Sequence, residues 1–174
     1  MLLNAGSLSR AGVSVNWNKG RAYLGTSCAL AGETPWVDML DLDLLGKSLS
    51  FTVDLSSVGC NCNAAIYLVS MSQHRTGPSV DPSCSGDPFY CDANSVCGTT
   101  PCAEIDLMEA NNHAFISVMH KSSDPNGMAH GLGGGGVGWS GPRDFTRDQY
   151  GVGCSCIDTR RPFNVEYAFS ESFE

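Results

Sequence analysis

The amino-acid sequence predicts an all-β protein built as a curved β-sandwich. No long stretch carries apolar residues at helical spacing, several short segments alternate apolar with polar residues, and 20 glycines and 8 prolines supply turns and loops. At 174 residues the chain is long enough for one domain with its own core and too short for two. Because it shows neither an internal repeat nor a linker, we expect residues 1–174 to belong to a single domain.

Five segments carry the patterns of strands. Residues 49–55 alternate Leu, Phe, Val and Leu with polar partners, as in a strand with one buried face. Residues 64–71 are nearly all apolar, which is typical of a central strand covered on both faces. Residues 104–109 and 114–120 follow as two further strands, and residues 163–169 alternate again. Their arrangement predicts antiparallel strands joined by large loops.

Two long loops, residues 72–102 and 121–156, hold most of the cysteines. The nine cysteines stand at positions 28, 60, 62, 84, 91, 97, 102, 154 and 156. Their placement in loops rich in Gly, Pro and Asn favours disulfides formed in an oxidising compartment, and so a secreted, extracellular protein. A tetrahedral zinc site typically uses Cys-x-x-Cys pairs, whereas the close pairs here are Cys-x-Cys. Since nine is odd, one thiol is unpaired or its partner lies outside this chain.

The net charge of the chain and the sequence of its first residues limit the kinds of molecule that it can bind and the compartment in which it is expected. A net charge of −8 argues against nucleic acid, whose phosphates require a basic face, and is compatible with a neutral polymer such as a polysaccharide. No segment is apolar for long enough to span a membrane, and residues 1–4 lack the basic start and apolar run of a signal peptide. A disulfide-rich chain without an export signal is expected to be a fragment. We expect a monomer that needs no cofactor.

The strongest functional signal is the acidic strand over residues 104–109. Side-chain alternation puts Glu104 and Asp106 on one face. Glu109 falls one residue out of step, so we predict a β-bulge near Met108 that returns it to this face, since bulges are frequent beside active sites. Three carboxylates on one face repel one another. This repulsion is expected to raise the pKa of one of them so that it stays protonated near neutral pH.

Cleavage of a glycosidic bond requires such a pair, one ionised carboxylate as nucleophile and one protonated carboxyl group as acid. With the bulge, the Cα atoms of Glu104 and Glu109 would lie roughly 13 Å apart at about 3.3 Å per residue. Two glutamates leaning together would bring their carboxyl groups to about 5–5.5 Å, the separation of a retaining enzyme. Asp106 is shorter and suits a supporting role that orients Glu104. The alternative is a solvated acidic face on an edge strand.

Several blocks match, in the correct order, the sequence pattern of one known family. They are Ala-Glu-Ile-Asp-Leu-Met-Glu-Ala-Asn at 103–111, Phe-Thr-Val-Asp-Leu at 51–55, Gly-Cys at 59–60, the strand at 63–71 and Tyr-Cys-Asp at 90–92. On these blocks the chain resembles glycoside hydrolase family 7, the cellulases, whose signature is Glu-x-Asp-x-x-Glu-Ala-Asn. The catalytic domains of that family are much longer, so the resemblance implies a partial domain that is inactive or poorly folded alone.

The resemblance implies a concanavalin-like jelly-roll β-sandwich with a long cleft. It also implies retaining hydrolysis of the β-1,4-glucosidic bonds of cellulose by double displacement. By position, Glu104 would be the nucleophile, Asp106 its partner and Glu109 the acid/base. His120 would be a cleft histidine next to the acid/base. The residues implied to bind substrate are Asn63, Tyr67, Tyr90, Asp92 and Arg143.

Other interpretations stay open. Taken singly, Tyr67 is typical of a core residue, Arg143 of a solvated loop charge and His120 of a structural histidine. A lectin-like, non-catalytic glycan-binding sandwich would not need both glutamates. A Ca²⁺ or Zn²⁺ site would use the three carboxylates and a histidine, but the ligating loop glycines of such sites are missing. A β-1,3-glucanase shares a similar acidic strand and differs in the flanking residues.

Overall fold

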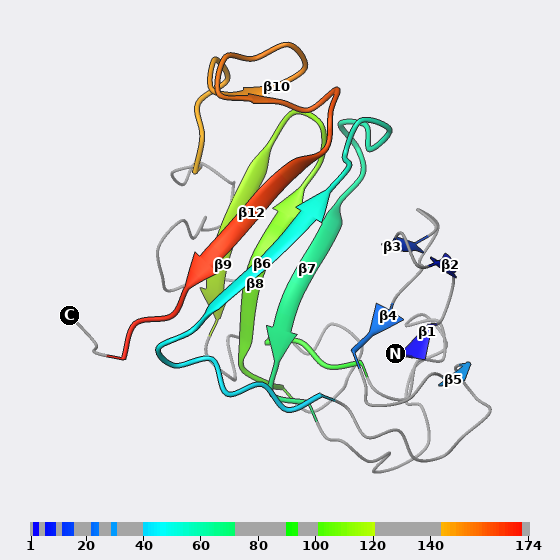
Figure 1. The fold of residues 1–174 in the computed structure, drawn as a ribbon, viewed down its shortest axis with the longest axis vertical. Coiled ribbons are helices and arrows are strands. Elements are labelled where there is room, and N and C mark those ends of the chain that lie inside the picture. The colour runs from blue at the N-terminus through cyan, green and yellow to red at the C-terminus, as the bar shows by residue number, and fades with distance from the viewer. Residues whose placement is uncertain are drawn as a thin grey trace.

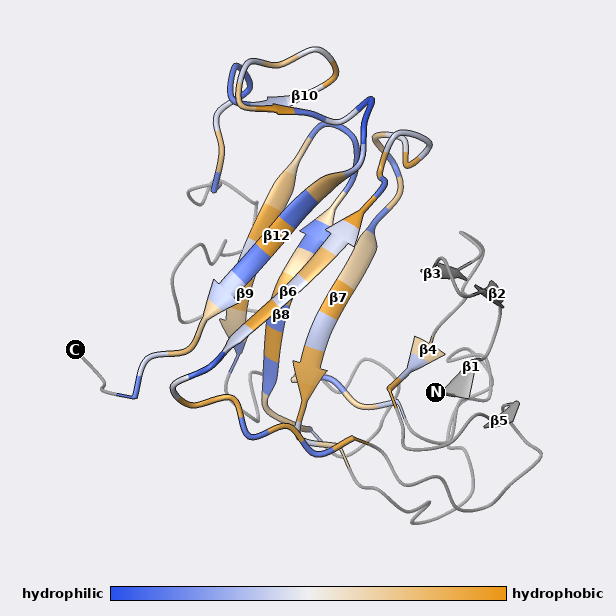
Figure 2. Cartoon of the chain, in the orientation of Figure 1, coloured by the Kyte–Doolittle hydropathy of each residue, from blue (hydrophilic) through white to orange (hydrophobic). Residues whose placement is uncertain are grey.

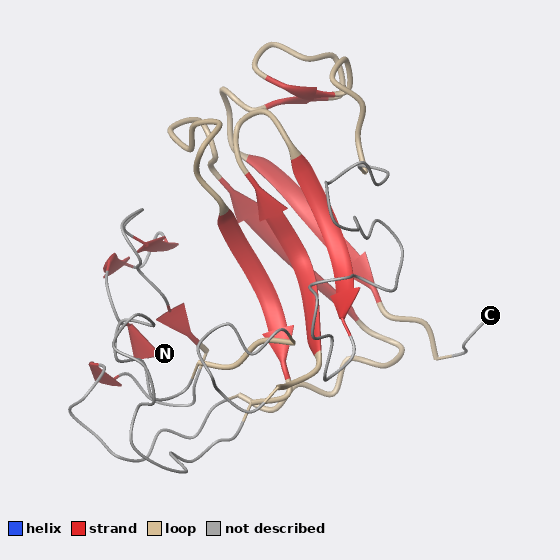
Figure 3. Ribbon diagram, turned by 180° about the vertical axis from the view of Figure 1, so that it is seen from behind, coloured by secondary structure: helices blue, strands red, loops and turns tan. Residues whose placement is uncertain are grey.

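Every regular element that the structure describes is a β-strand (Figure 1, Figure 3). The computed structural model describes residues 2–3, 6–9, 12–15, 22–24, 29–30, 40–71, 90–93, 101–120 and 144–171. Within these ranges there is no helix with the length and hydropathy needed to cross a membrane.

Two antiparallel sheets form the body of the molecule. One contains β7 (Ala64–Val69), β8 (Glu104–Ala110) and β9 (Phe115–His120), in this order, and the other pairs β6 (Ser48–Val53) with β12 (Phe163–Ala168). In Figure 1, β6 and β12 lie in front of the three-stranded sheet, so the two sheets form facing layers. The predicted all-β sandwich is confirmed.

The hydrophobic core fills the space between the two layers. Along β6 and β12, half-buried and exposed residues alternate, which is visible as alternating bands in Figure 2. The inward residues Phe51 and Val165 pack against a buried cluster. The fully buried members of this cluster are Leu55, Met108, Ala110, Phe115 and Tyr150. The rings of Phe115, Phe145 and Tyr150 lie 5.7 to 5.8 Å apart between centroids, a separation at which aromatic pairs attract one another.

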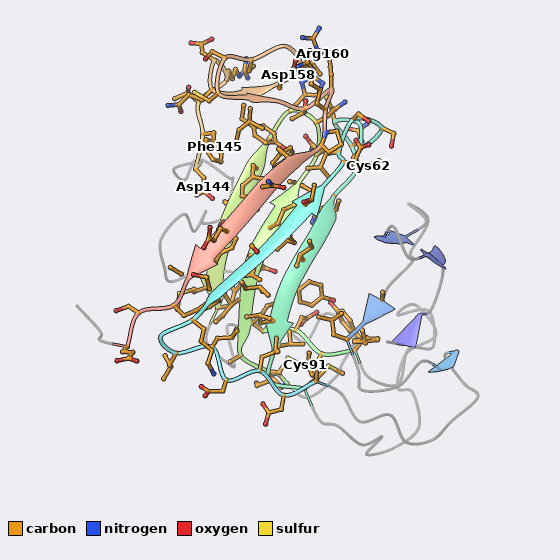
Figure 4. The ribbon with its side chains drawn as sticks, in the orientation of Figure 1. Cys62, Cys91, Asp144, Phe145, Asp158 and Arg160 are labelled. Atoms are coloured by element: carbon orange, nitrogen blue, oxygen red, sulfur yellow. A yellow bond between two sulfur atoms is a disulfide. The ribbon has the colours of Figure 1, made fainter. Side chains whose placement is uncertain are left out.

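Short strands complete the described structure. Their bounds are β1 Leu2–Leu3, β2 Gly6–Ser9, β3 Gly12–Val15, β4 Ala22–Tyr23, β5 Ala29–Leu30, β10 Tyr150–Gly151 and β11 Ile157–Asp158. β1 pairs with β4 and β5, β2 pairs with β3, and β10 lies parallel to β11. An ion pair between Asp158 and Arg160, at 2.6 Å, stabilises the loop after β11 at one end of the molecule (Figure 4).

The strands predicted at 49–55, 104–109, 114–120 and 163–169 are confirmed as β6, β8, β9 and β12. The prediction for residues 64–71 is only half right. They form β7, but among the described strands β7 lies at the outer position of its sheet, and β8 occupies the centre. An apolar run indicates that both faces of a strand are covered, and it carries no information on how many neighbouring strands bond to it.

Candidate active site

The central strand β8 contains one irregularity, and it lies between the acidic residues. Asp106 and Glu109 are three residues apart, but their partners on β9 are only two apart. The register with β7 shifts at the same place. β8 therefore has one extra residue, Leu107, that pairs with neither strand, and the bulge predicted near Met108 is confirmed.

The bulge brings Glu109 to the same side of β8 as Glu104 and Asp106. The negative charge of Glu109 raises the pKa of both other carboxyl groups, which requires the three to lie close together. We call these three residues the acidic face. Tyr67 pairs with Asp106 across β7, and His120 pairs with Glu104 across β9. Since paired residues project to the same side of a sheet, both side chains accompany the acidic face.

A short loop ahead of β8 approaches Glu104. The disulfide between Cys91 and Cys102 ties this loop to the start of β8, and Figure 4 shows Cys91 at that end of the sheet. The backbone N–H of Cys102 donates to the carbonyl of Asp92 at 3.1 Å, which fixes the loop further. The backbone N–H of Ala93 then donates to Oε2 of Glu104 at 3.2 Å. The loop thus supplies Glu104 with a donor that favours its ionised form.

Opposing influences act on the ionisation of Glu104. Burial is the largest of them and raises the pKa of Glu104. The N–H of Ala93 and the nearby His120 act in the opposite direction, while the charges of Asp92 and Glu109 raise the pKa further. The net result is a carboxyl group whose pKa lies above its ordinary value of 4.5.

Asp106 is the most deeply enclosed member of the acidic face, with 6% of its surface exposed. Burial, assisted by the charges of Glu104 and Glu109, raises the pKa of Asp106 to about 8. Asp106 therefore keeps its proton at neutral pH. The raised pKa expected from the sequence falls here, on the middle carboxyl group, because it is buried and has a negative neighbour on each side. Nε2 of His120 lies 3.2 Å from Oδ2 of Asp106.

The structure brings the other described candidates to this site. Nδ2 of Asn63 donates to Oε1 of Glu109 at 2.8 Å, so its observed partner is a member of the acidic face. The hydroxyl of Tyr90 donates to Oδ2 of Asp92. Asp92 is 4% exposed, and its negative charge raises the pKa of Glu104.

Two of the sequence-based assignments need comment. The resemblance implied that His120 lies next to Glu109, but the register places it opposite Glu104, at the other end of the acidic face. Arg143 lies outside the described residues. Sequence reasoning also missed the N–H of Ala93, because a backbone donor leaves no side-chain signal.

Three side chains of the site could together hold a cation. One ligand atom each of Glu104, Asp106 and His120 lie within 4.8 Å of one another. Two carboxylates and an imidazole are donors that Zn²⁺ accepts, provided that the ligands are deprotonated. Asp106 would have to release its proton at neutral pH, which opposes binding.

The chain is similar to known cellulases in sequence. It is 31% identical over 155 residues to endoglucanase type C of Fusarium oxysporum, covering 74% of this chain and 36% of that protein. It is 26% identical over 189 residues to endoglucanase EG-1 of Hypocrea jecorina, covering 95% of this chain and 39% of that protein. No protein-family model matches the chain.

A similarity of structure accompanies that of sequence. The crystal structure of a cellobiohydrolase from Melanocarpus albomyces, complexed with cellotetraose, aligns with a TM-score of 0.54 at 25% identity. The alignment covers 97% of this chain and 47% of the cellobiohydrolase. The chain thus spans less than half the length of each of these proteins.

Proposed function

We propose that this chain is part of the catalytic domain of a family 7 glycoside hydrolase, a secreted enzyme that cleaves β-1,4-glucosidic bonds of cellulose or a related β-glucan with retention of configuration. The observation that carries the proposal is the bulge in β8, which gathers Glu104, Asp106 and Glu109 on one face. The similarity to endoglucanases and to a cellobiohydrolase complexed with cellotetraose supports this class of substrate.

Glu104 is the proposed nucleophile. Its ionised carboxylate attacks the anomeric carbon of the sugar while Glu109 donates a proton to the departing glycosidic oxygen. A covalent glycosyl-enzyme forms, and the released sugar chain leaves with the proton. Glu109, now ionised, takes a proton from water, and the water oxygen attacks the same anomeric carbon and frees Glu104. Two displacements restore the original configuration.

Asp106 and His120 support this cycle. Because the pKa of Asp106 is about 8, Asp106 is neutral and adds no charge beside the nucleophile. Glu104 can therefore ionise first, and its charge in turn helps Asp106 to keep its proton. Nε2 of His120 lies 3.2 Å from Oδ2 of Asp106, so the two side chains can share the proton beside Glu104. The pair thus orients the nucleophile without competing for the sugar.

The residues around the acidic face are proposed to bind substrate. Tyr67 offers a ring and a hydroxyl on the same side as Asp106. Tyr90 and Asp92 form a hydrogen-bonded pair beside Glu104. Asn63 orients Glu109 and extends the site at the Glu109 end of the acidic face. We propose a monomer that uses no cofactor, and the Cys91–Cys102 disulfide supports an oxidising, extracellular location.

Paired glutamine variants test the proposal in the protein expressed from its whole coding sequence. Glu104→Gln is expected to lower kcat on a soluble β-1,4-glucan by about 10⁴-fold or more, as loss of a nucleophile does. Glu109→Gln is expected to cost about 10²- to 10⁴-fold, the contribution of a general acid/base. Glu166→Gln, the same change on the exposed side of β12, is the control and should retain activity. Hydrolysis unaffected by either of the first two changes would contradict the proposal.

A small anion distinguishes the two glutamates. In Glu104→Ala, azide can take the place of the lost nucleophile, so an activated β-glucoside should yield the α-azide. In Glu109→Ala the nucleophile remains and azide replaces water in the second displacement, so the product should be the β-azide. NMR of the products reads the configuration. The opposite pattern would exchange the two roles, and a protein that binds glucan without hydrolysing it would favour the lectin-like alternative.

A further inference from the structure

A side chain in the opposite layer contacts the bulge in β8. The hydroxyl of Tyr167, on β12, donates a hydrogen bond to the carbonyl oxygen of Leu107. Leu107 is the inserted residue, without a partner among the described strands β7, β8 and β9, and is 1% exposed. A carbonyl group buried in this position is destabilising unless a donor reaches it, and Tyr167 is that donor.

Ser117 on β9 completes the contact. Its Oγ lies 2.5 Å from the hydroxyl of Tyr167 and 3.1 Å from the carbonyl oxygen of Leu107. Each hydroxyl has one proton. A consistent arrangement has Ser117 donating to Tyr167 and Tyr167 donating to Leu107. Oδ2 of Asp144 accepts the backbone N–H of Ser117 at 2.8 Å and holds this part of β9 in place.

The ring of Tyr167 is held where its hydroxyl meets the bulge. It stacks on Phe51 with the ring centroids 6.4 Å apart and the planes inclined by 20°. Burial raises the pKa of Tyr167, so its hydroxyl keeps the proton that it donates. The contact therefore joins the two layers of the sandwich at the one irregular residue of β8.

We propose that Tyr167 is a positioning residue, which holds the bulge of β8 and thereby keeps Glu109 on the side of Glu104. If the bulge were lost and Leu107 joined a regular two-residue alternation, the separation of five residues would turn Glu109 to the face opposite Glu104. Tyr167 acts through the Leu107 carbonyl and touches neither glutamate in this role. The inference rests on the function proposed above for its effect on catalysis, whereas its effect on the bulge stands apart from any activity.

Two tyrosine-to-phenylalanine variants test the inference, each removing one buried hydroxyl. Tyr167→Phe removes the donor to Leu107. Tyr150→Phe is the matched control, since the hydroxyl of Tyr150 donates to the carbonyl of Asn111 at 2.7 Å, beyond the end of β8. Both variants are expected to lower Tm to a similar extent. Tyr167→Phe alone should lower kcat by about 10- to 100-fold, the effect of a misplaced catalytic group, and leave KM within about twofold.

Backbone hydrogen exchange gives a second measurement that needs no activity. In Tyr167→Phe the amides of Met108 and Glu109 should exchange faster than in the wild-type protein, and in Tyr150→Phe they should not. Ser117→Ala, which leaves the ring of Tyr167 in place, should produce a smaller change of the same kind. Wild-type exchange and wild-type kcat in Tyr167→Phe would overturn the inference. Faster exchange at the bulge in a protein without glucanase activity would uphold it and sink the proposed function instead.

Discussion

Replacing Asp106 by asparagine tests the electrostatics of the acidic face through stability. The pKa of Asp106 is about 8 in the folded protein and about 3.8 when the chain is unfolded. Between these values the folded state holds a proton that the unfolded state has released. Folding therefore takes up a proton, so this group makes the folded protein less stable as the pH rises from about 4 to about 8. Asparagine is similar in shape and does not titrate.

The magnitude follows from the proton count. One proton changes the free energy of unfolding by about 1.4 kcal/mol per pH unit, so between pH 5 and pH 7 Asp106 lowers the free energy of unfolding by roughly 3 kcal/mol. Urea unfolding of the wild-type protein and Asp106→Asn at both pH values measures the effect. From pH 5 to pH 7 the free energy of unfolding of the variant should rise by roughly 3 kcal/mol relative to that of the wild-type protein. Ionisable groups that do not interact with Asp106 contribute equally to both proteins and cancel in the difference.

Asp54→Asn provides the matched control. The hydroxyl and backbone N–H of Ser56 lower the pKa of Asp54, so this group is ionised in both folded and unfolded states between pH 5 and pH 7. The free energy of unfolding of Asp54→Asn should therefore differ from that of the wild-type protein by the same amount at pH 5 and at pH 7. A difference between Asp106→Asn and wild type that stays constant from pH 5 to pH 7 would refute the raised pKa of Asp106.

Three further predictions concern the surroundings of the acidic face. Replacing Cys91 and Cys102 by serine opens a loop with a sequence separation of 11 and should cost about 3 kcal/mol in urea unfolding; equal stability of the oxidised wild type and the variant would contradict this. Asn63→Ala removes the donor 2.8 Å from Glu109 and should lower kcat by about 3- to 10-fold, whereas Asn63→Asp, which lacks the N–H, should not restore it; unchanged kcat in the alanine variant would argue against an orienting role. Treatment with EDTA should leave hydrolysis unchanged, and a loss of activity that Zn²⁺ restores would indicate a metal at Glu104 and its neighbours.

The strands and the bulge could be predicted because they depend on local alternation. Residues 49–55 and 163–169 show a period of two, and each forms a strand with one half-buried face. The position of Glu109, one residue out of step with Glu104, already required an irregularity between them. A functional constraint on two side chains was thus enough to predict a feature of the backbone.

Contacts between distant segments could not be predicted in this way. The alternation around Tyr167 indicates its half-burial, but its partner Leu107 is 60 residues away in sequence and is chosen by the packing of two layers. The same holds for the N–H of Ala93 and for the position of His120 opposite Glu104, both of which depend on loop geometry and register. The ionisation of Asp106 depends on burial, which spacing alone does not give.

Because β8 contains an extra residue, the face on which an acidic side chain lies depends on the backbone conformation as well as on the spacing in the sequence. A strand with a perfect two-residue repeat presents acids to one side at separations of two or four, whereas here a separation of five achieves the same result through a local distortion. Deleting either Leu107 or Met108 would restore the regular repeat and still leave both glutamates facing one way, with a shorter gap between them. Inserting or deleting one residue in β8 therefore changes the distance between Glu104 and Glu109. That distance sets the room for a sugar and a water molecule between the two carboxyl groups.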